Sequence, residues 1–288
     1  MTNCDTVAIR DPNARDPYPT RSCLCGYRID DGCGQVFYSL NQIDRRHDCS
    51  VVKALRNHIT FPSFELLYDI TDPTESLEIY FKPERVEPLR HFAFLIQVAR
   101  DISLMRPGIF GYSQFGEPVK VYFYHDKGNT PKTFSWSDFQ KLGSTLVILY
   151  PVRKTFTDGQ IGIRQENLNS CFIFKSNIHN LESEAQKLLD SKDAKFTNKN
   201  TQCFNCSVEK ETLLRCSKCK LALYCSTECQ KKSWATHHKS LCSQFDILLR
   251  LAVLPRIEQF QKEFNFDRND SNCFLSDYIF SEKFVNTS

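Results

Sequence analysis

The feature that most constrains this chain is a stretch of forty residues, 203–242, that holds half of its fourteen cysteines. Four of these cysteines form two Cys-x-x-Cys pairs, Cys203/Cys206 and Cys216/Cys219. A structural zinc ion takes four soft or borderline ligands in a tetrahedron, and a Cys-x-x-Cys turn supplies two thiolates from one tight bend. Each pair therefore predicts half of a zinc site.

The other half of each site is expected from residues at helical spacing. Cys225 and Cys229 are four residues apart, and so are His238 and Cys242. Residues four apart lie on the same face of a helix, so both members of a pair can reach one metal ion. A disulfide framework is the alternative interpretation of these cysteines. The spacing favours two zinc ions with eight ligands: Cys203, Cys206, Cys216, Cys219, Cys225, Cys229, His238 and Cys242.

The residues between the ligands narrow the interpretation. Leu223-Tyr224 stands before Cys225, Gln230 directly follows Cys229, and Trp234 precedes two histidines. With these residues, segment 203–242 resembles a MYND-type zinc finger. The resemblance implies a shallow groove for short proline-containing peptides, lined by Gln230 and Trp234. Ligands interleave in that family, which implies one zinc site of Cys203, Cys206, Cys225 and Cys229 and another of Cys216, Cys219, a histidine and Cys242.

The histidine ligand has two candidates. The family usually places it three residues after the tryptophan and four before the last cysteine, and here the first rule selects His237 and the second His238. We expect His238, because a separation of one turn from Cys242 lets two helical side chains meet one metal ion. His237 is the alternative.

Composition and the first residues point to an intracellular protein, cytoplasmic or nuclear. Residues 1–5 lack the basic start and apolar run of a secretory signal, and reduced thiols suit that compartment. The apolar stretches 92–99 and 145–152 are too short to span a bilayer, so no membrane anchor is expected. The cysteines outside the finger are expected to be ordinary thiols, with a metal clip at Cys23, Cys25 and Cys33 as the alternative.

Residues 61–180 differ in kind from the finger. Apolar runs rich in β-branched and aromatic residues predict strands at 92–98, 119–124, 145–150 and 171–174. A capping serine and a closing glycine predict a short helix over 135–143. An OB-type barrel has three strands, a helix and two strands, and the stretch 134–174 resembles the second half of that fold.

The chain is therefore expected to be an α+β protein. Residues 181–202 predict a helix followed by a polar, lysine-rich linker, and an apolar stripe from Phe245 to Ala252 predicts another helix that stops at Pro255. The predicted parts are an irregular N-terminal segment at 1–60, a β-rich domain at 61–180, the helix and linker at 181–202, the finger at 203–242 and a helical C-terminal extension at 243–288.

The expected function is that of an interaction adaptor. All zinc ligands come from the protein, whereas a catalytic zinc keeps an open position. The finger is therefore expected to bind a short peptide segment of a partner protein. No enzyme is expected, because the Asn-His-Ser motif of methyltransferases that carry a MYND finger is missing: Asn57-His58 is followed by Ile59, and only forty-six residues follow Cys242.

The alternative is a nucleic-acid-associated factor in which the finger recruits a protein partner. Tyr122 or Tyr124 on an exposed strand face would stack on the bases of a single strand, and Arg153 and Lys154 would contact its phosphates. Composition does not favour this alternative, because a net charge of +3 and a pI near 8.1 fall short of the pI above about 9 that is typical of a dedicated nucleic-acid-binding domain.

Overall fold

The computed structural model describes residues 54–56, 60–71, 80, 88, 91–124, 135–139, 141–196 and 201–254. All of them lie in one compact unit that begins at Ala54. Three sequence-based expectations fall outside the described residues, and they stay predictions: most of the irregular segment 1–60, the metal clip at Cys23, Cys25 and Cys33, and the part of the C-terminal extension from Pro255 onward.

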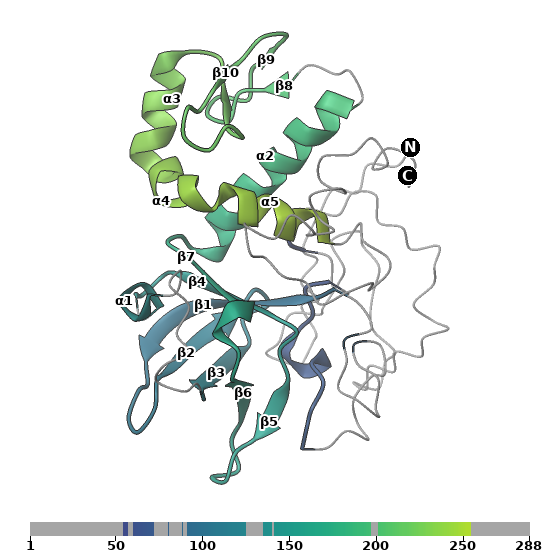
Figure 1. Cartoon of the computed structure of the whole chain (residues 1–288), viewed down its shortest axis with the longest axis vertical. Helices are drawn as coiled ribbons and strands as arrows, with labels where there is room; N and C mark the ends of the chain where they lie inside the picture. Colours follow the sequence, from purple (N-terminus) through teal and green to yellow (C-terminus); the bar gives the residue numbers. More distant parts are fainter. Residues whose placement is uncertain are drawn as a thin grey trace, which may run out of the picture. The chain divides into compact units, whose positions relative to one another are not determined.

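Seven strands form one open sheet (Figure 1). The strand order is β5-β6-β3-β2-β1-β4-β7, and neighbouring strands are antiparallel except for β3 and β6, which run parallel. Because β5 and β7 each pair with a single neighbour, the sheet does not close into the barrel that the sequence suggested. The strands are β1 Ala93–Asp101, β2 Gly108–Ser113, β3 Pro118–Phe123, β4 Thr145–Leu149, β5 Arg153–Thr155, β6 Ile161–Gln165 and β7 Cys171–Phe174.

Burial differs along this sheet. All five residues of β4 are buried, which indicates that both faces of the sheet are covered there. In β3 only the alternate residues Val119, Val121 and Phe123 are buried. Successive side chains of a strand point to opposite faces, so at β3 one face packs on the core and the other is open to solvent.

The predicted runs at 92–98, 119–124, 145–150 and 171–174 are confirmed as β1, β3, β4 and β7. Strands β2, β5 and β6 were not predicted, because glycines and basic residues hide their apolar pattern. Gly111 of β2 shows why glycine is needed there: a Cβ atom would lie 2.3 Å from the backbone oxygen of Gln97 in β1. A glycine at this position lets the two strand backbones approach closely.

The described helices confirm the α+β class. Helix α2 continues through residues 191–196, which the sequence suggested as part of a linker. Among the described residues, no helix is both long and apolar enough to cross a membrane. The helices are α1 Trp136–Phe139, α2 Ile178–Phe196, α3 Thr227–Ser233, α4 Lys239–Leu241 and α5 Phe245–Val253; single turns are η1 Phe64–Leu66, η3 Leu168–Ser170, η4 Trp234–His238 and η5 Cys242–Gln244.

Helix α2 packs on both the sheet and the finger. One continuous cluster of buried apolar side chains includes Leu95 and Val147 of the sheet, Leu181 and Ala185 of α2, and Phe204 of the finger. Helix α2 also packs along α5, which follows the finger. The finger is therefore joined to the sheet by a shared apolar core.

Candidate metal centres

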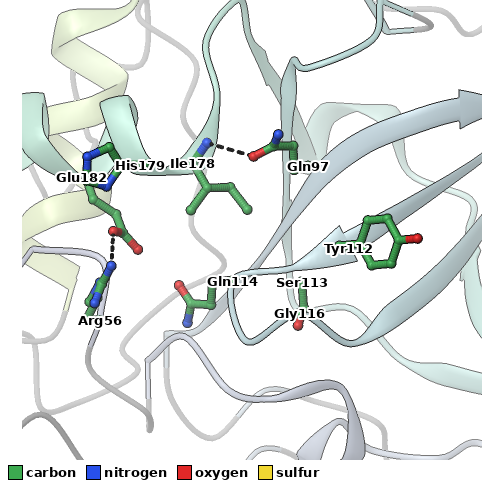
Figure 2. Close-up of a pocket in the computed structure, with 9 residues that line it drawn as sticks. All are labelled: Arg56, Gln97, Tyr112, Ser113, Gln114, Gly116, Ile178, His179 and Glu182. Carbon is green, nitrogen blue, oxygen red and sulfur yellow. Dashed lines mark hydrogen bonds and ion pairs between the residues drawn. The ribbon is translucent and has the colours of Figure 1, made fainter. Parts of the chain in front are cut away.

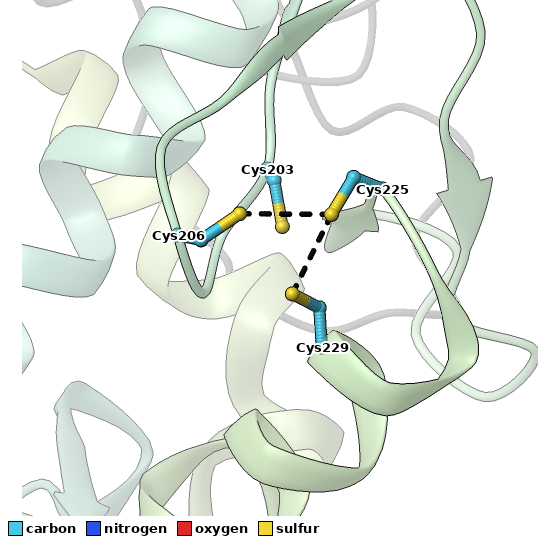
Figure 3. Close-up of side chains that lie close together, drawn as sticks. All are labelled: Cys203, Cys206, Cys225 and Cys229. Carbon is cyan, nitrogen blue, oxygen red and sulfur yellow. Dashed lines mark hydrogen bonds between the residues drawn. The ribbon is translucent and has the colours of Figure 1, made fainter.

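Short hairpins and a run of helical turns build the finger. The hairpin strands are β8 Thr201–Gln202, β9 Glu209–Lys210, β10 Leu214–Arg215 and β11 Leu223–Tyr224. Within this frame, two groups of four donor atoms gather, and all atoms of a group lie within 4.8 Å of one another. The first group comprises Cys203, Cys206, Cys225 and Cys229 (Figure 3), and the second comprises Cys216, Cys219, His238 and Cys242.

The distances within each group fit tetrahedral zinc. A Zn–S bond of about 2.3 Å gives a tetrahedron with edges of about 3.8 Å. The Sγ atom of Cys225 lies 3.6 Å from that of Cys206 and 3.4 Å from that of Cys229, and the sulfurs of Cys216 and Cys242 are 3.8 Å apart. A disulfide needs about 2.05 Å. The described cysteines are free thiols, so the disulfide interpretation is wrong for the finger.

The two Cys-x-x-Cys turns have the same backbone design. In the first, Ser207 N–H donates to the Cys203 carbonyl at 2.8 Å; in the second, Lys220 N–H donates to the Cys216 carbonyl at 3.0 Å. Ser207 and Lys220 both take a left-handed backbone, with φ of 58° and 62°. This conformation closes each turn tightly enough for both of its sulfurs to face one point.

Helix α3 positions the remaining ligands of the first group. Ser226 caps the helix, since its side chain accepts a hydrogen bond from the Cys229 N–H at 3.2 Å. Cys225 stands immediately before this cap and Cys229 lies in the first turn. The Asn205 amide donates to the Cys229 sulfur at 3.4 Å, an outer contact that holds the thiol in place.

The two histidines face different partners. His238 is fully buried, and its Nε2 atom lies 3.4 Å from the Cys216 sulfur and 3.8 Å from the Cys219 sulfur. His237 instead places its Nε2 atom 2.9 Å from the Glu184 carboxylate in α2. The structure thus brings His238, and not His237, to the second group of donor atoms.

A π-helical turn at Trp234–His238 accounts for the conflict between the two spacing rules. Such a turn accommodates one extra residue inside an α-helical run. It lets His238 keep its one-turn separation from Cys242 although it stands four residues after Trp234. Regular α-helical spacing alone could not reveal this turn.

Two thiols of the first group, Cys203 and Cys225, have pKa values shifted in opposite directions in the absence of a metal ion. Burial raises the pKa of Cys203, but backbone N–H groups of Cys225, Cys206 and Asn205 donate to its sulfur and together lower that pKa to about 6. The pKa of Cys225 rises to about 12, chiefly because its thiol donates to the Cys229 sulfur. Cys203 and Cys225 therefore do not ionise together, and a divalent cation would balance the thiolate charge.

The histidine of the second group is also suited to bind metal. Burial lowers the pKa of His238 to about 4, so its imidazole is neutral at neutral pH. A neutral imidazole nitrogen is a common zinc ligand. The donor atoms of both groups therefore fit zinc in number and distance, and His238 also fits in its protonation state.

Contacts between α2 and the finger were missed by sequence reasoning. Glu184 is 2% exposed and accepts from Lys187 at 2.8 Å as well as contacting His237. Lys187 also donates to the backbone oxygen of Phe204 at 2.9 Å. The position of Glu184 in the helix could have indicated these contacts, because it lies three residues after Leu181 on the buried stripe of the helix.

The suggested peptide-binding residues lie at the junction of α3 and η4. The Trp234 N–H donates to the Gln230 backbone oxygen, so the two residues are one helical turn apart. The Trp234 ring meets the His238 ring at a centroid distance of 5.8 Å and an angle of 62°. Both residues are partly buried, and Trp234 packs against the shared core.

Comparison with known proteins is consistent with this geometry. The MYND finger family model matches residues 203–242. Histone-lysine N-methyltransferase SMYD3 of Mus musculus is 51% identical over 41 residues, which cover 14% of this chain and 9% of that protein. Protein-lysine N-methyltransferase SMYD4 of Homo sapiens is 36% identical over 70 residues, which cover 24% of this chain and 9% of that protein.

One solved structure resembles part of this chain only weakly. The crystal structure of Schizosaccharomyces pombe Pot1pC bound to single-stranded DNA matches with 12% identity, covering 36% of this chain and 90% of that chain. Its TM-score of 0.24 is too low to establish a common fold.

These relatives contradict the expectation that the chain is not an enzyme, since they are lysine methyltransferases. That expectation relied on a missing motif and on the residues that follow the finger, and neither excludes catalysis. The matches span about a tenth or less of each relative, 9% of SMYD3 and 10% of SMYD2 from Mus musculus, so they do not show methyltransferase activity here. What they share with this chain is the zinc-binding segment. Residues 203–242 are a MYND finger, a zinc-binding protein-interaction module with two Cys/His groups for two zinc ions.

Proposed function

We propose that the MYND finger binds short proline-containing peptide segments of a partner protein, and that Gln230 and Trp234 contact the peptide. Each group of donor atoms supplies four protein ligands, which complete a structural zinc site. The metal ions then stabilise the finger, and its surface carries the interaction.

The position of Trp234 is the observation that carries this proposal. Its ring is supported by His238 inside the finger while part of it stays exposed. Gln230 lies one turn earlier on the same face of the helix and offers an amide that can both donate and accept. Aromatic rings line the grooves that recognise proline-rich segments, and an indole gives a wide, rigid surface at low entropic cost.

We further propose that the two interleaved groups hold one zinc ion each, with His238 rather than His237 as the eighth ligand. The support is the direction of the two rings, since His238 faces Cys216 while His237 faces Glu184. Thiolate ligands persist where thiols stay reduced. This supports an intracellular location, cytoplasmic or nuclear.

The two tryptophans of the chain make a direct test possible. In the zinc-loaded variant Trp136→Phe, Trp234 is the single indole, and its emission reports on the proposed groove. We expect the emission to shift during titration with short proline-containing peptides. The same peptides with alanine in place of proline should leave the emission unchanged.

Trp234→Ala is expected to weaken peptide binding by about 30-fold or more, as loss of an anchoring aromatic side chain does. The matched control is Trp136→Ala, which removes the other indole, in α1 of the β-rich region. The proposal is wrong if Trp234→Ala retains two zinc ions and binds the peptides as tightly as the parent chain.

A further inference from the structure

Among the residues that the structure describes, only half of one face of the sheet is covered. Helix α2 and the shared core cover the end of this face where Leu95 and Val147 lie side by side. The strand register continues the same face through Tyr112 of β2 and Tyr122 of β3, away from the shared core. We name this uncovered part the open face; its residues are Arg100, Arg106, Phe110, Tyr112, Lys120, Tyr122, Tyr124, Lys154, Phe156 and Arg164.

The aromatic side chains of the open face are held in fixed orientations. Tyr122 packs edge-to-face with Phe156 at 5.2 Å, and Phe110 packs edge-to-face with Tyr112 at 5.3 Å. A Cβ atom at Gly108 would lie 2.8 Å from the Tyr122 ring, so the glycine makes room for this ring close to the sheet. Tyr112 is 46% exposed. The rings are therefore ordered before any ligand arrives.

Cations stack on these rings. The Arg106 and Arg164 guanidinium groups stand over the Tyr124 ring at 3.7 and 4.2 Å from its centroid, and Arg100 stands over Phe110 at 4.6 Å. A stacked guanidinium can in turn serve as a stacking surface for a ligand.

The charge on the open face is positive. Its cations are Arg100, Arg106, Lys120, Lys154 and Arg164. One of these cations is paired, since the carboxylate of Glu166, which is 62% exposed, lies 2.7 Å from Arg164. Asp101 pairs in register with the buried Ile109, which places it on the opposite face.

A polar pocket of about 370 Å³ lies where the open face meets α2 (Figure 2). Gln97 and Gln114 line it, and the Oε1 atom of Gln114 is buried without a hydrogen-bond partner among the described residues. Arg56 and Glu182 form an ion pair at its rim, at 2.6 Å, and so cancel each other's charge. The pocket offers hydrogen-bonding groups next to Tyr112.

We propose that the open face binds single-stranded nucleic acid. Its arginines and lysines contact the phosphates, while unpaired bases stack on Tyr112, Tyr122 and the guanidinium planes over Tyr124. A duplex hides its base faces, so the rings have no role in binding one. The pocket at Gln97 and Gln114 receives the edge of a base at the end of the strand.

The structure changes the residues that the sequence suggested for this role. Tyr122, Tyr124 and Lys154 lie on the open face. Arg153 does not, because its register partner is the buried Ile163 and its guanidinium lies 3.8 Å from the Asp69 carboxylate. Arg100, Arg106 and Arg164 take its place.

Fluorescence anisotropy with the zinc-loaded full chain tests this proposal. The probes are labelled oligothymidylate and oligouridylate of about 12 nucleotides, within the usual site size of such surfaces. We expect binding to weaken with salt, with a slope of log K against log salt of about −3.5 if all five cations contact phosphates. The ratio of the two affinities tells whether DNA or RNA is preferred. A duplex of the same length should bind at least about tenfold more weakly, since it loses the stacking contribution.

Variants separate this surface from general attraction to polyanions. Tyr124→Ala removes the ring that supports the Arg106 and Arg164 guanidinium planes, so the loss of this stacking position should weaken single-strand binding by about 5- to 150-fold. Arg106→Gln should reduce the salt slope by about 0.7. Lys231→Gln in the finger removes the same charge elsewhere and should change neither. Arg106 is exposed, so Arg106→Gln carries the test if Tyr124→Ala does not fold.

Three outcomes would overturn the proposal. The first is unchanged binding by folded Tyr124→Ala and Arg106→Gln. The second is an equal loss in Lys231→Gln, which indicates attraction to the whole chain. The third is equal competition by polyglutamate, which indicates a surface for acidic proteins.

Discussion

The finger and the sheet reach a defined structure by different routes. In the sheet, Phe94, Val121 and Ile148 are buried between strands whose partners lie far away in the sequence. In the finger, few large apolar side chains are buried, Phe204 and Tyr224 among them, and the turns converge on two groups of donor atoms. The spacing of metal ligands within a short segment therefore specifies the finger, whereas the sheet depends on packing between residues far apart in the sequence.

Zinc removal should give the largest effect and separate the two regions. Each structural zinc contributes roughly 10–16 kcal/mol to folding, so a strong chelator should unfold 203–242 while the strands within 93–174 stay protected. Hydrogen exchange followed by mass spectrometry measures both. Cys216→Ser should cause loss of one zinc ion, whereas Cys171→Ser, at a buried thiol in β7, should retain two. Simultaneous loss of protection in the strands would show that the regions form one cooperative unit.

The second prediction tests which of the two histidines is a zinc ligand. His238→Ala should lower the zinc content from two ions toward one, because its ring nitrogen faces the second group. His237→Ala should retain two ions and lose the contact with Glu184. Metal analysis of the purified variants decides between them. One zinc ion in His237→Ala and two in His238→Ala would reverse the assignment.

The shared core gives a third test. Leu181 is fully buried in the core that sheet and finger share, so Leu181→Ala should cost about 2–5 kcal/mol of unfolding free energy. Urea unfolding can be followed at Trp136 in a Trp234→Phe background and at Trp234 in a Trp136→Phe background. Both midpoints should fall. The control Leu142→Ala, at an exposed side chain, should change each by less than about 0.5 kcal/mol. A fall at one tryptophan alone would show that the core does not couple the regions.

The smallest predicted effect is a pH dependence of stability that arises from His91 beside the sheet. Burial lowers the pKa of His91 from 6.5 to about 4, and its Nδ1 atom lies 2.7 Å from the Tyr150 hydroxyl. The folded chain holds this histidine neutral, so its contribution is fully present above pH 6.5 and is lost as pH falls toward 4. His91→Gln removes the titration and should flatten the pH dependence of stability in this window by up to about 3 kcal/mol. Urea midpoints measured across the window check this, and an unchanged slope would contradict it.

The finger was the more predictable region, because its ligands sit at fixed local spacings. Cys-x-x-Cys turns and pairs four apart were enough to suggest the eight ligands, and the resemblance to a MYND-type finger implied which of them would meet. The left-handed backbone of Ser207 and Lys220 left no mark in the sequence, since neither residue is glycine. Nor did the sequence reveal that Glu184, far from the finger in the chain, would contact His237.

The sheet was predictable only where apolar runs are strong. Strand β4 was predicted because its sequence is an apolar run, and every one of its residues is buried. Strand β6 pairs through Ile163 with Val121, a parallel partner more than thirty residues earlier, and no local pattern specifies such a partner. The sequence predicted only some residues of the open face. Its arginines contact the ring of Tyr124 from a neighbouring strand and from the tip of a hairpin, and no local pattern predicts such contacts.

The π-helical turn at Trp234–His238 has a consequence for alignment. One residue added to a regular α-helix rotates everything beyond it by about 100° relative to what precedes. Here the turn absorbs that residue, so the ligands on both sides keep their places, and positions counted forward from Trp234 and backward from Cys242 disagree by one. An ungapped alignment to a finger without the added residue therefore superposes either the tryptophan or the histidine ligand, but not both.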